Sequence, residues 1–229
     1  MKKLKIGITC YPTVGGSGVI ATELGKKLAE LGHEIHFITS SVPFRLNKIY
    51  SNVFFHEVEV SQYSVFQYAP YDIALASKMA DVIKSEGLDV LHVHYAIPHA
   101  VCAVLARDMR EILTTLHGTD ISILGEDSTL TSAIKYGMER SDVVTAVSNS
   151  LKEETYEKIG TTKEIKTIYN FVDEQIFRRR DAGNLKEQFG IRSDERVMIH
   201  ISNFRKIKRL PDVVNAFFKV RAKMPVKLL

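Results

Sequence analysis

Residues 4 to 39 read LKIGITCYPTVGGSGVIATELGKKLAELGHEIHFIT, the pattern of a β-strand, a glycine-rich turn, an α-helix and a second β-strand. The apolar run from Leu4 to Cys10 predicts a buried strand. Apolar residues at helical spacing predict a helix over Val19 to Leu31, which Gly32 ends. His33 to Thr39 predicts the next strand. Together these elements form a βαβ unit, which builds a parallel sheet with a right-handed crossover.

The turn before the helix carries Gly15, Gly16 and Gly18 around a serine. Glycine has no Cβ, so the backbone here can approach a ligand closely, while the helix directs its free N–H groups and positive dipole end to the same place. The turn therefore predicts an anion site, most plausibly for phosphate. A dinucleotide fingerprint fits poorly because Tyr11 to Gly15 separate the strand from Gly16 and no carboxylate ends the second strand. The lysine of a Walker loop is also missing after Gly18. A purely structural turn remains the alternative.

Strands and helices continue to alternate through residue 170. We expect strands over 52–60, 88–94, 112–116, 142–147 and 165–169, and helices over 71–86, 97–109, 129–139 and 150–159. The helix over 71–86 should bury an apolar face of Ile73, Leu75, Ala76, Met79, Ala80 and Ile83. The aromatic stretch 61–70 is expected to be a loop that closes over a ligand. This alternation predicts an α/β fold with a doubly wound, largely parallel sheet.

Polar residues follow five of these strands at their carboxyl ends. They are the glycine turn, His94 and Tyr95, His117 to Asp120, Ser148 and Asn149, and Asn170. In a doubly wound sheet these positions converge on one crevice, where ligands bind. Ser148 as a helix cap and Asn170 as a turn residue are equally open interpretations.

His92, His94 and His99 raise the question of a metal site, because His-x-His places two rings on one face of a strand. The surrounding sequence, VLHVHYAIPHAV, offers no acidic or cysteine partner. We therefore expect no metal there, with His94 at the crevice and His92 packed behind it.

The composition is that of an ordinary soluble protein: 229 residues, 45% of them hydrophobic, with a formal net charge of +4. Basic residues are scattered except at Arg178 to Arg180 and Arg205 to Arg209, which argues against a nucleic-acid surface. Cys10 and Cys102, both in apolar segments, fit a reducing compartment. The sequence shows no secretory signal and no apolar run near the roughly 20 residues that span a bilayer. We expect a cytoplasmic protein without stable membrane association; a homo-oligomer is left open.

A charged stretch follows residue 170 and predicts a domain boundary. We expect an N-terminal domain over 1–170, a linker over 171–195 and the beginning of a second Rossmann-like domain over 196–229. That domain starts with a strand over 196–202, a helix over 210–223 and a strand from 226. Its pattern predicts about 100 to 200 further residues to complete the sheet. We accordingly expect residues 1–229 alone to be inactive and poorly soluble.

Several motifs in combination resemble the retaining glycosyltransferases of family 4, which have the GT-B fold. They are the glycine turn with its helix, HGTD at 117–120, AVSNS at 146–150, NFVDEQIF at 170–177 and ISNFRKIKR at 201–209. The family pattern in the last segment is G-R with a lysine five residues after the arginine. Here Ser202 and Asn203 stand in the G-R positions, Lys208 keeps the lysine place, and Arg205 would supply the guanidinium. The family's E-x7-E segment does not occur within these residues.

More narrowly, the segments TCYPTVGGSG, VHYAIPHA, LHGTD and SNFRKIKR resemble those of family members that begin bacillithiol biosynthesis. This resemblance implies transfer of N-acetylglucosamine from UDP-N-acetylglucosamine to the hydroxyl of L-malate, with retention and without a metal or other cofactor. Another sugar or a lipid as acceptor, and a noncatalytic sugar-nucleotide-binding domain, are the alternatives.

The resemblance also implies roles for particular residues. We expect catalysis by His117, Arg205 and Lys208. The donor diphosphate should be bound by Gly15, Gly16, Arg205 and Lys208, because stabilising its charge is the main catalytic task. The carboxylates of malate should be bound by Ser17, Tyr95, Thr119 and Asn149. No carboxylate is placed as a nucleophile, so we expect same-face attack assisted by a phosphate oxygen.

Overall fold

The computed structural model describes residues 2–108, 110–181 and 183–229. By its internal contacts the chain consists of two compact units, residues 1–171 and 172–229. The first unit holds the glycine turn and the large sheet, and the second contains most of the stretch expected as a linker.

Seven strands form the sheet of the first unit, in the order β3-β2-β1-β4-β5-β6-β7, and every neighbouring pair is parallel. Their bounds are β1 Lys5–Thr9, β2 Glu34–Thr39, β3 Val53–Glu57, β4 Val90–His94, β5 Glu111–Leu116, β6 Val143–Ala146 and β7 Ile165–Thr167. The strand order reverses between β1 and β4, so the predicted doubly wound parallel sheet is confirmed. Ligands of such sheets bind outside the carboxyl ends of the strands at this reversal.

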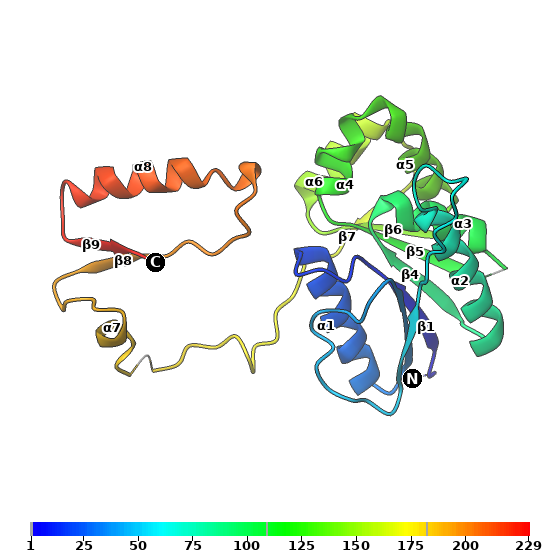
Figure 1. The fold of residues 1–229 in the computed structure, drawn as a ribbon, viewed down its shortest axis with the longest axis horizontal. Coiled ribbons are helices and arrows are strands. Elements are labelled where there is room, and N and C mark those ends of the chain that lie inside the picture. Colours follow the sequence, from blue (N-terminus) through cyan, green and yellow to red (C-terminus); the bar gives the residue numbers. More distant parts are fainter. Residues whose placement is uncertain (1, 109, 182) are drawn as a thin grey trace. The chain divides into compact units, whose positions relative to one another are not determined.

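Helices cover both faces of this sheet. Figure 1 shows α1 on one side and α2 and α3 on the other. The helices are α1 Gly16–Glu30, α2 Tyr71–Glu86, α3 Val101–Ala106, α4 Thr119–Ser122, α5 Ser128–Arg140 and α6 Asn149–Ile159, with shorter turns η1 Ala96–Ala100 and η2 Leu124–Glu126. Across the described parts of the chain, no helix combines the length and apolar character that crossing a membrane requires.

Local sequence accounts for several helix ends. Helix α2 has the predicted bounds, and Gly87 ends it in the left-handed conformation with φ of 66°. Ser148 is the N-cap of α6, because its Oγ accepts a hydrogen bond from the N–H of Leu151 at 3.1 Å. The interpretation of Ser148 as a helix cap is therefore confirmed.

Three local predictions were wrong. Helix α1 begins at Gly16, three residues before the predicted Val19. The expected helix over 97–109 is instead the distorted turn η1 followed by the short α3, because Ile97 precedes Pro98 and is extended, with φ of −133° and ψ of 133°. Residue 109 lies outside the described residues. In α2, Ile73 is 63% exposed, and Val82 is buried in its place.

The apolar core lies on both faces of the sheet. On the α1 face, Ile8, Ile35 and Phe37 pack against Ala21 and its neighbours. On the opposite face one cluster joins α2 and α3 to β4, and a second cluster joins α5 and α6 to β5, β6 and β7. Because side chains alternate along a strand, the residues between these core positions in β4, β5 and β6 face the α1 side.

The second unit contains a small βαβ arrangement. Strand β8 (Arg196–Met198) pairs in parallel with β9 (Val226–Leu228), and α8 (Leu210–Arg221) connects them. The short helix α7 (Leu185–Gln188) precedes β8, and the turn η3 (Lys206–Lys208) precedes α8. The predicted strand–helix–strand order is confirmed.

Candidate active site

The glycine turn is the first turn of helix α1. Gly15 is its N-cap, extended with φ of −70° and ψ of 154°, and no side chain caps the helix. The first intrahelical bond runs from the N–H of Val19 to the carbonyl of Gly15 at 3.1 Å. The N–H groups of Gly16, Ser17 and Gly18 precede that bond, and a helix provides no internal partner for them. They form the donor set that an anion needs.

Gly16 and Gly18 of this turn differ in the space that a side chain would have. A Cβ on Gly18 would lie 2.2 Å from the carbonyl oxygen of Tyr11, so any side chain there collides with the backbone. A Cβ on Gly16 would meet nothing within 4 Å. Gly18 is therefore required by the fold, whereas Gly16 borders open space in which a ligand group can sit.

A buried carboxylate holds the loops after β4 and β5 together. Asp120 is fully buried and accepts hydrogen bonds from the backbone N–H of Ala96 at 3.1 Å, of His117 at 3.1 Å and of Gly118 at 2.9 Å. Burial raises the pKa of Asp120, and these three donors oppose the rise. Asp120 thereby fixes the backbone from which His117 projects.

His117 is bonded to a second histidine. Its Nε2 lies 2.8 Å from Nδ1 of His94, at the end of β4. Whichever ring donates the proton, this bond occupies Nε2 and leaves Nδ1 as the ring nitrogen of His117 that is available to a ligand. The Nε2 atom of His94 is buried without a hydrogen-bond partner among the described residues. His94 therefore sets the orientation of His117.

Burial keeps the histidines around this crevice neutral. It lowers the pKa of His92 to about 3 and those of His99 and His117 to about 4, with smaller contributions from neighbouring histidines to the shifts of His92 and His117. The pKa of His94 falls well below its ordinary value for the same reason. At neutral pH, His117 thus offers a substrate a hydrogen bond rather than a positive charge.

Aromatic side chains connect the end of β1 with this cluster. The ring of Tyr11 meets Tyr95 edge-on with centroids 5.2 Å apart, and it lies 4.6 Å from the ring of His99. The rings of Tyr95 and His117 are nearly parallel at 6.3 Å. Tyr95 has a φ of 101°, a conformation that non-glycine residues seldom adopt and that is often found at functional sites.

The structure places the four predicted acceptor residues after the carboxyl ends of four strands, β1, β4, β5 and β6. Ser17 and Thr119 are half-buried in the first turns of α1 and α4. Tyr95 adjoins His117, as above. Asn149 is exposed at the start of α6, and its Nδ2 donates to the hydroxyl of Tyr169 at 3.2 Å. Tyr95 and His117 are brought together, and the acceptor roles of all four residues remain predictions.

Arg205 and Lys208 lie in the second unit. Both are exposed, and they flank the start and the end of the turn η3 before α8. Their roles at the donor diphosphate remain predictions.

A cavity of about 180 Å³ lies on the α1 face of the sheet. Ile20 and Leu24 of α1 line it together with His92, His94 and residues 168–171. A polar row crosses its sheet side: His92 Nε2 lies 2.8 Å from the hydroxyl of Thr115, which lies 2.8 Å from the hydroxyl of Thr145. Asn170 lines this mainly apolar cavity, so it adjoins His94 as the sequence predicted.

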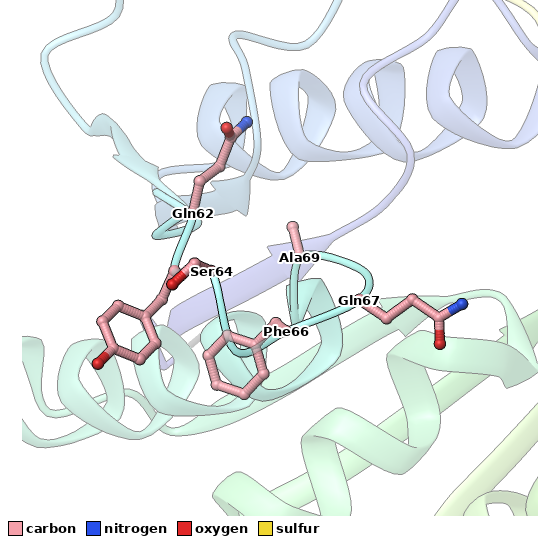
Figure 2. Close-up of a pocket in the computed structure, with 6 residues that line it drawn as sticks. Gln62, Ser64, Phe66, Gln67 and Ala69 are labelled. Carbon is pink, nitrogen blue, oxygen red and sulfur yellow. The ribbon is translucent and has the colours of Figure 1, made fainter.

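A larger, open hollow of about 450 Å³ lies in the aromatic loop over 61–70. Figure 2 shows that the amides of Gln62 and Gln67 point away from each other. Charged side chains do not line this hollow in the part of the chain that is described. Because its polar groups do not converge, it is a weaker candidate for a substrate site than the crevice.

Each histidine of the VLHVHYAIPHAV segment uses one ring nitrogen in a hydrogen bond within the protein. His92 bonds to Thr115, His94 bonds to His117, and Nδ1 of His99 donates to the carbonyl of His94 at 2.6 Å. They do not belong to the convergent set of metal-binding side chains found among the described residues.

Sequence reasoning missed two parts of this site. Asp120 was recognised within HGTD, but its bond to Ala96 depends on the tertiary arrangement of two loops. Tyr11 was assigned only to a loop, although an aromatic residue directly after a strand that leads to the crevice was a usable signal. The link between His94 and His117 follows from the pairing of β4 and β5, in which His94 is opposite Thr115.

This arrangement, a doubly wound sheet with a helix N-terminus and a neutral histidine at its reversal point, is that of the first domain of a GT-B glycosyltransferase. The chain belongs to glycosyltransferase family 4, whose pattern matches residues 14–176. The solved structure of a glycosyltransferase from Rickettsia africae has the same fold, with a TM-score of 0.70 at 17% identity over 100% of this chain and 68% of that one.

Among curated proteins, the chain is 63% identical to the N-acetyl-alpha-D-glucosaminyl L-malate synthase of Bacillus anthracis over 231 residues. This match covers 99% of the chain and 61% of that synthase. An uncharacterized glycosyltransferase of Methanocaldococcus jannaschii is 30% identical over 168 residues, which cover 72% of this chain and 46% of that protein. The chain thus spans about half to three fifths of the length of these relatives.

Proposed function

We propose that this chain is the acceptor-binding part of a retaining glycosyltransferase that moves N-acetylglucosamine from UDP-N-acetylglucosamine to the hydroxyl of L-malate, the first step of bacillithiol biosynthesis. The observation that carries the proposal is the 63% identity to the Bacillus anthracis synthase across 99% of the chain. The helix N-terminus at Gly16 and the neutral His117 at the same edge of the sheet support it chemically.

In the proposed reaction, the bond between the anomeric carbon and the diphosphate oxygen breaks as the malate hydroxyl attacks from the same face. The hydroxyl proton passes to a phosphate oxygen of departing UDP. The N–H groups of the glycine turn, with Arg205 and Lys208, stabilise the charge that develops on the diphosphate, so the step needs no metal. His117 hydrogen-bonds the donor sugar through Nδ1, since His94 occupies Nε2.

Malate is a dianion, and its carboxylates need donors. Ser17 and Thr119 offer hydroxyls and helix N–H groups, and Tyr95 offers a phenol beside His117. Asn149 must leave Tyr169 or share its amide to reach malate. We further propose a cytoplasmic location, which two buried, unpaired cysteines support.

The test compares the chain alone with the chain joined to the remaining portion of the Bacillus anthracis synthase. UDP release is followed with L-malate, with simple sugars and without an acceptor. We expect the extended protein to release UDP with L-malate and to form a malate glycoside that retains the anomeric configuration. UDP release with a sugar but not with malate would refute the proposed acceptor.

A further inference from the structure

Two histidines and a glutamate converge at the edge of the first unit's sheet that is formed by β2 and β3. His36 lies in β2, His56 lies in β3, and Glu86 is the last residue of α2. One ligand atom from each lies within 4.8 Å of the other two. The register explains this: His56 is opposite Ile38, which belongs to the core cluster beneath α2, so His56 and His36 face that helix.

The ring of His36 is held so that one nitrogen faces the cluster. His36 is fully buried, and Phe54 stacks on it at 5.0 Å. Its Nε2 donates to Oε1 of Glu34 at 3.0 Å, and Lys5 pairs with the same carboxylate at 2.8 Å. With its proton on Nε2, the ring directs the lone pair of Nδ1 toward Nε2 of His56, 2.9 Å away.

The hydrogen bond from His36 to Glu34 is of the kind that orients metal-binding histidines in proteins. A metal-binding histidine almost always gives its other ring N–H to a carboxylate or carbonyl, which fixes the tautomer and raises the basicity of the ligating nitrogen. Glu34 fills that position behind His36. His56 lies opposite this nitrogen, with its own Nε2 turned toward Nδ1 of His36.

We propose that His36, His56 and Glu86 bind one divalent transition-metal ion, with zinc as the expected ion, through Nδ1, Nε2 and a carboxylate oxygen. Two imidazoles, one carboxylate and a water make a tetrahedral set of the kind zinc accepts. Tetrahedral zinc with Zn–N bonds of about 2.0 Å holds its nitrogens roughly 3.3 Å apart. The rings therefore need to separate by only a few tenths of an ångström, which half-buried His56 can provide.

The charges near the site set its expected affinity. Lys5 neutralises Glu34, so Glu86 supplies the negative charge that the ion meets directly. Lys78 lies near enough to contribute to the lowered pKa of His56, and it opposes a cation. A site with two neutral ligands and one carboxylate, opposed by a lysine, should bind zinc less tightly than thiolate sites do.

The site is separate from the crevice. The crevice follows β1, β4 and β5, whereas this cluster joins two strands at one sheet edge to the carboxyl end of α2. An ion there cross-links β2, β3 and α2. Its role is to stabilise the first unit, and glycosyl transfer proceeds without it.

The test measures zinc binding to the 229-residue chain by calorimetry after removal of metals with a chelator. We expect one zinc ion per chain and a rise in Tm with zinc. His56→Ala and Glu86→Gln should abolish both effects, and Glu34→Gln should weaken binding by about 10-fold to 100-fold, the usual cost of losing the carboxylate behind a ligand. Cobalt in place of zinc should give the visible absorption of a tetrahedral ion.

Glu57→Gln is the matched control, because Glu57 is an exposed carboxylate next to His56 that does not belong to the cluster. It should bind zinc like the unmodified chain. Circular dichroism without metal checks that Glu86→Gln, a change near the surface, folds normally. Absence of zinc binding by the unmodified chain, or binding that survives both His56→Ala and Glu86→Gln, would overturn the proposal and leave a simple hydrogen bond between two histidines.

Discussion

Acidification from pH 7 to pH 5.5 should destabilise the first unit strongly, because its crevice buries histidines in their neutral form. His92 has a pKa of about 3, and His99 and His117 have pKa values of about 4, whereas an unfolded histidine has about 6.5. Below pH 6.5 the unfolded chain therefore binds protons that the folded chain excludes. Stability from these rings is complete above about pH 7 and is lost as the pH falls from 6.5 toward the folded values.

The size of the loss follows from these values. At pH 5.5 an unfolded histidine is about nine-tenths protonated, while each of the three buried rings remains neutral. Between pH 7 and pH 5.5 each ring thus removes about 1.2 kcal/mol from the free energy of unfolding, or roughly 3 to 4 kcal/mol for the three. His94 acts in the same direction, and Asp120 in the opposite one, because its folded pKa is raised. The total free energy of unfolding of a typical domain is only about 5 to 15 kcal/mol.

The assay is urea unfolding at pH 7, 6.2 and 5.5, followed by far-ultraviolet circular dichroism and by the fluorescence of the nine tyrosines, since the chain has no tryptophan. His99→Asn should reduce the pH dependence by about a third, whatever it does to stability at pH 7. His200→Asn, in the second unit, is the comparison variant that removes a histidine outside the crevice. A difference below about 1 kcal/mol between pH 7 and 5.5 would show that these rings titrate normally.

Three further outcomes are expected. Gly16→Val should abolish UDP release by the extended protein while the fold survives, since its Cβ enters open space. Gly18→Ala should lower Tm, because its Cβ would lie 2.2 Å from a backbone oxygen. Activity and circular dichroism distinguish the two effects. Arg205→Ala and Lys208→Ala should each weaken UDP binding by about 10-fold or more, measured by calorimetry. Thr119→Val should mainly raise the KM for malate, and an equal effect on UDP affinity would remove it from the acceptor site.

Much of the fold was predictable because the signals are local and repeated. Apolar runs, with glycines at the ends of helices, located the nine strands that the described residues form and helix α2. The alternation of strands and helices predicted a parallel sheet. The helix over 97–109 failed because Pro98 and the extended Ile97 interrupt an apolar stretch that otherwise has helical periodicity. The predicted burial of Ile73 was wrong because helical periodicity alone does not show how far the sheet covers the apolar face of a helix.

The site was predictable only in outline. Strand order alone brings the segments after β1, β4 and β5 to one edge, so His94, Tyr95 and His117 were expected there. The bond from His94 to His117 and the three donors to Asp120 depend on side-chain directions and loop paths that no local pattern encodes. The cluster of His36, His56 and Glu86 was missed for the same reason. Its members are far apart in sequence, and they meet through the register of β2 with β3 and the position of the end of α2.

The charge state of His117 affects how an anionic acceptor is held, because the ring of Tyr95, a proposed acceptor residue, lies 6.3 Å from the ring of His117. With a pKa of about 4, His117 is almost entirely unprotonated at both pH 7.5 and pH 6.5. Malate is a dianion throughout most of this range, so its affinity for the chain should change by less than about 2-fold between these values. A histidine with an ordinary pKa would gain about half a charge over the same interval and would tighten binding clearly. Calorimetric titration of the chain with L-malate at both values distinguishes the two cases. The contrary result is a several-fold rise in affinity at pH 6.5 that His117→Asn removes. It would mean that the ring of His117 becomes charged near the bound malate, and the assignment of His117 as a neutral hydrogen-bonding group would be wrong.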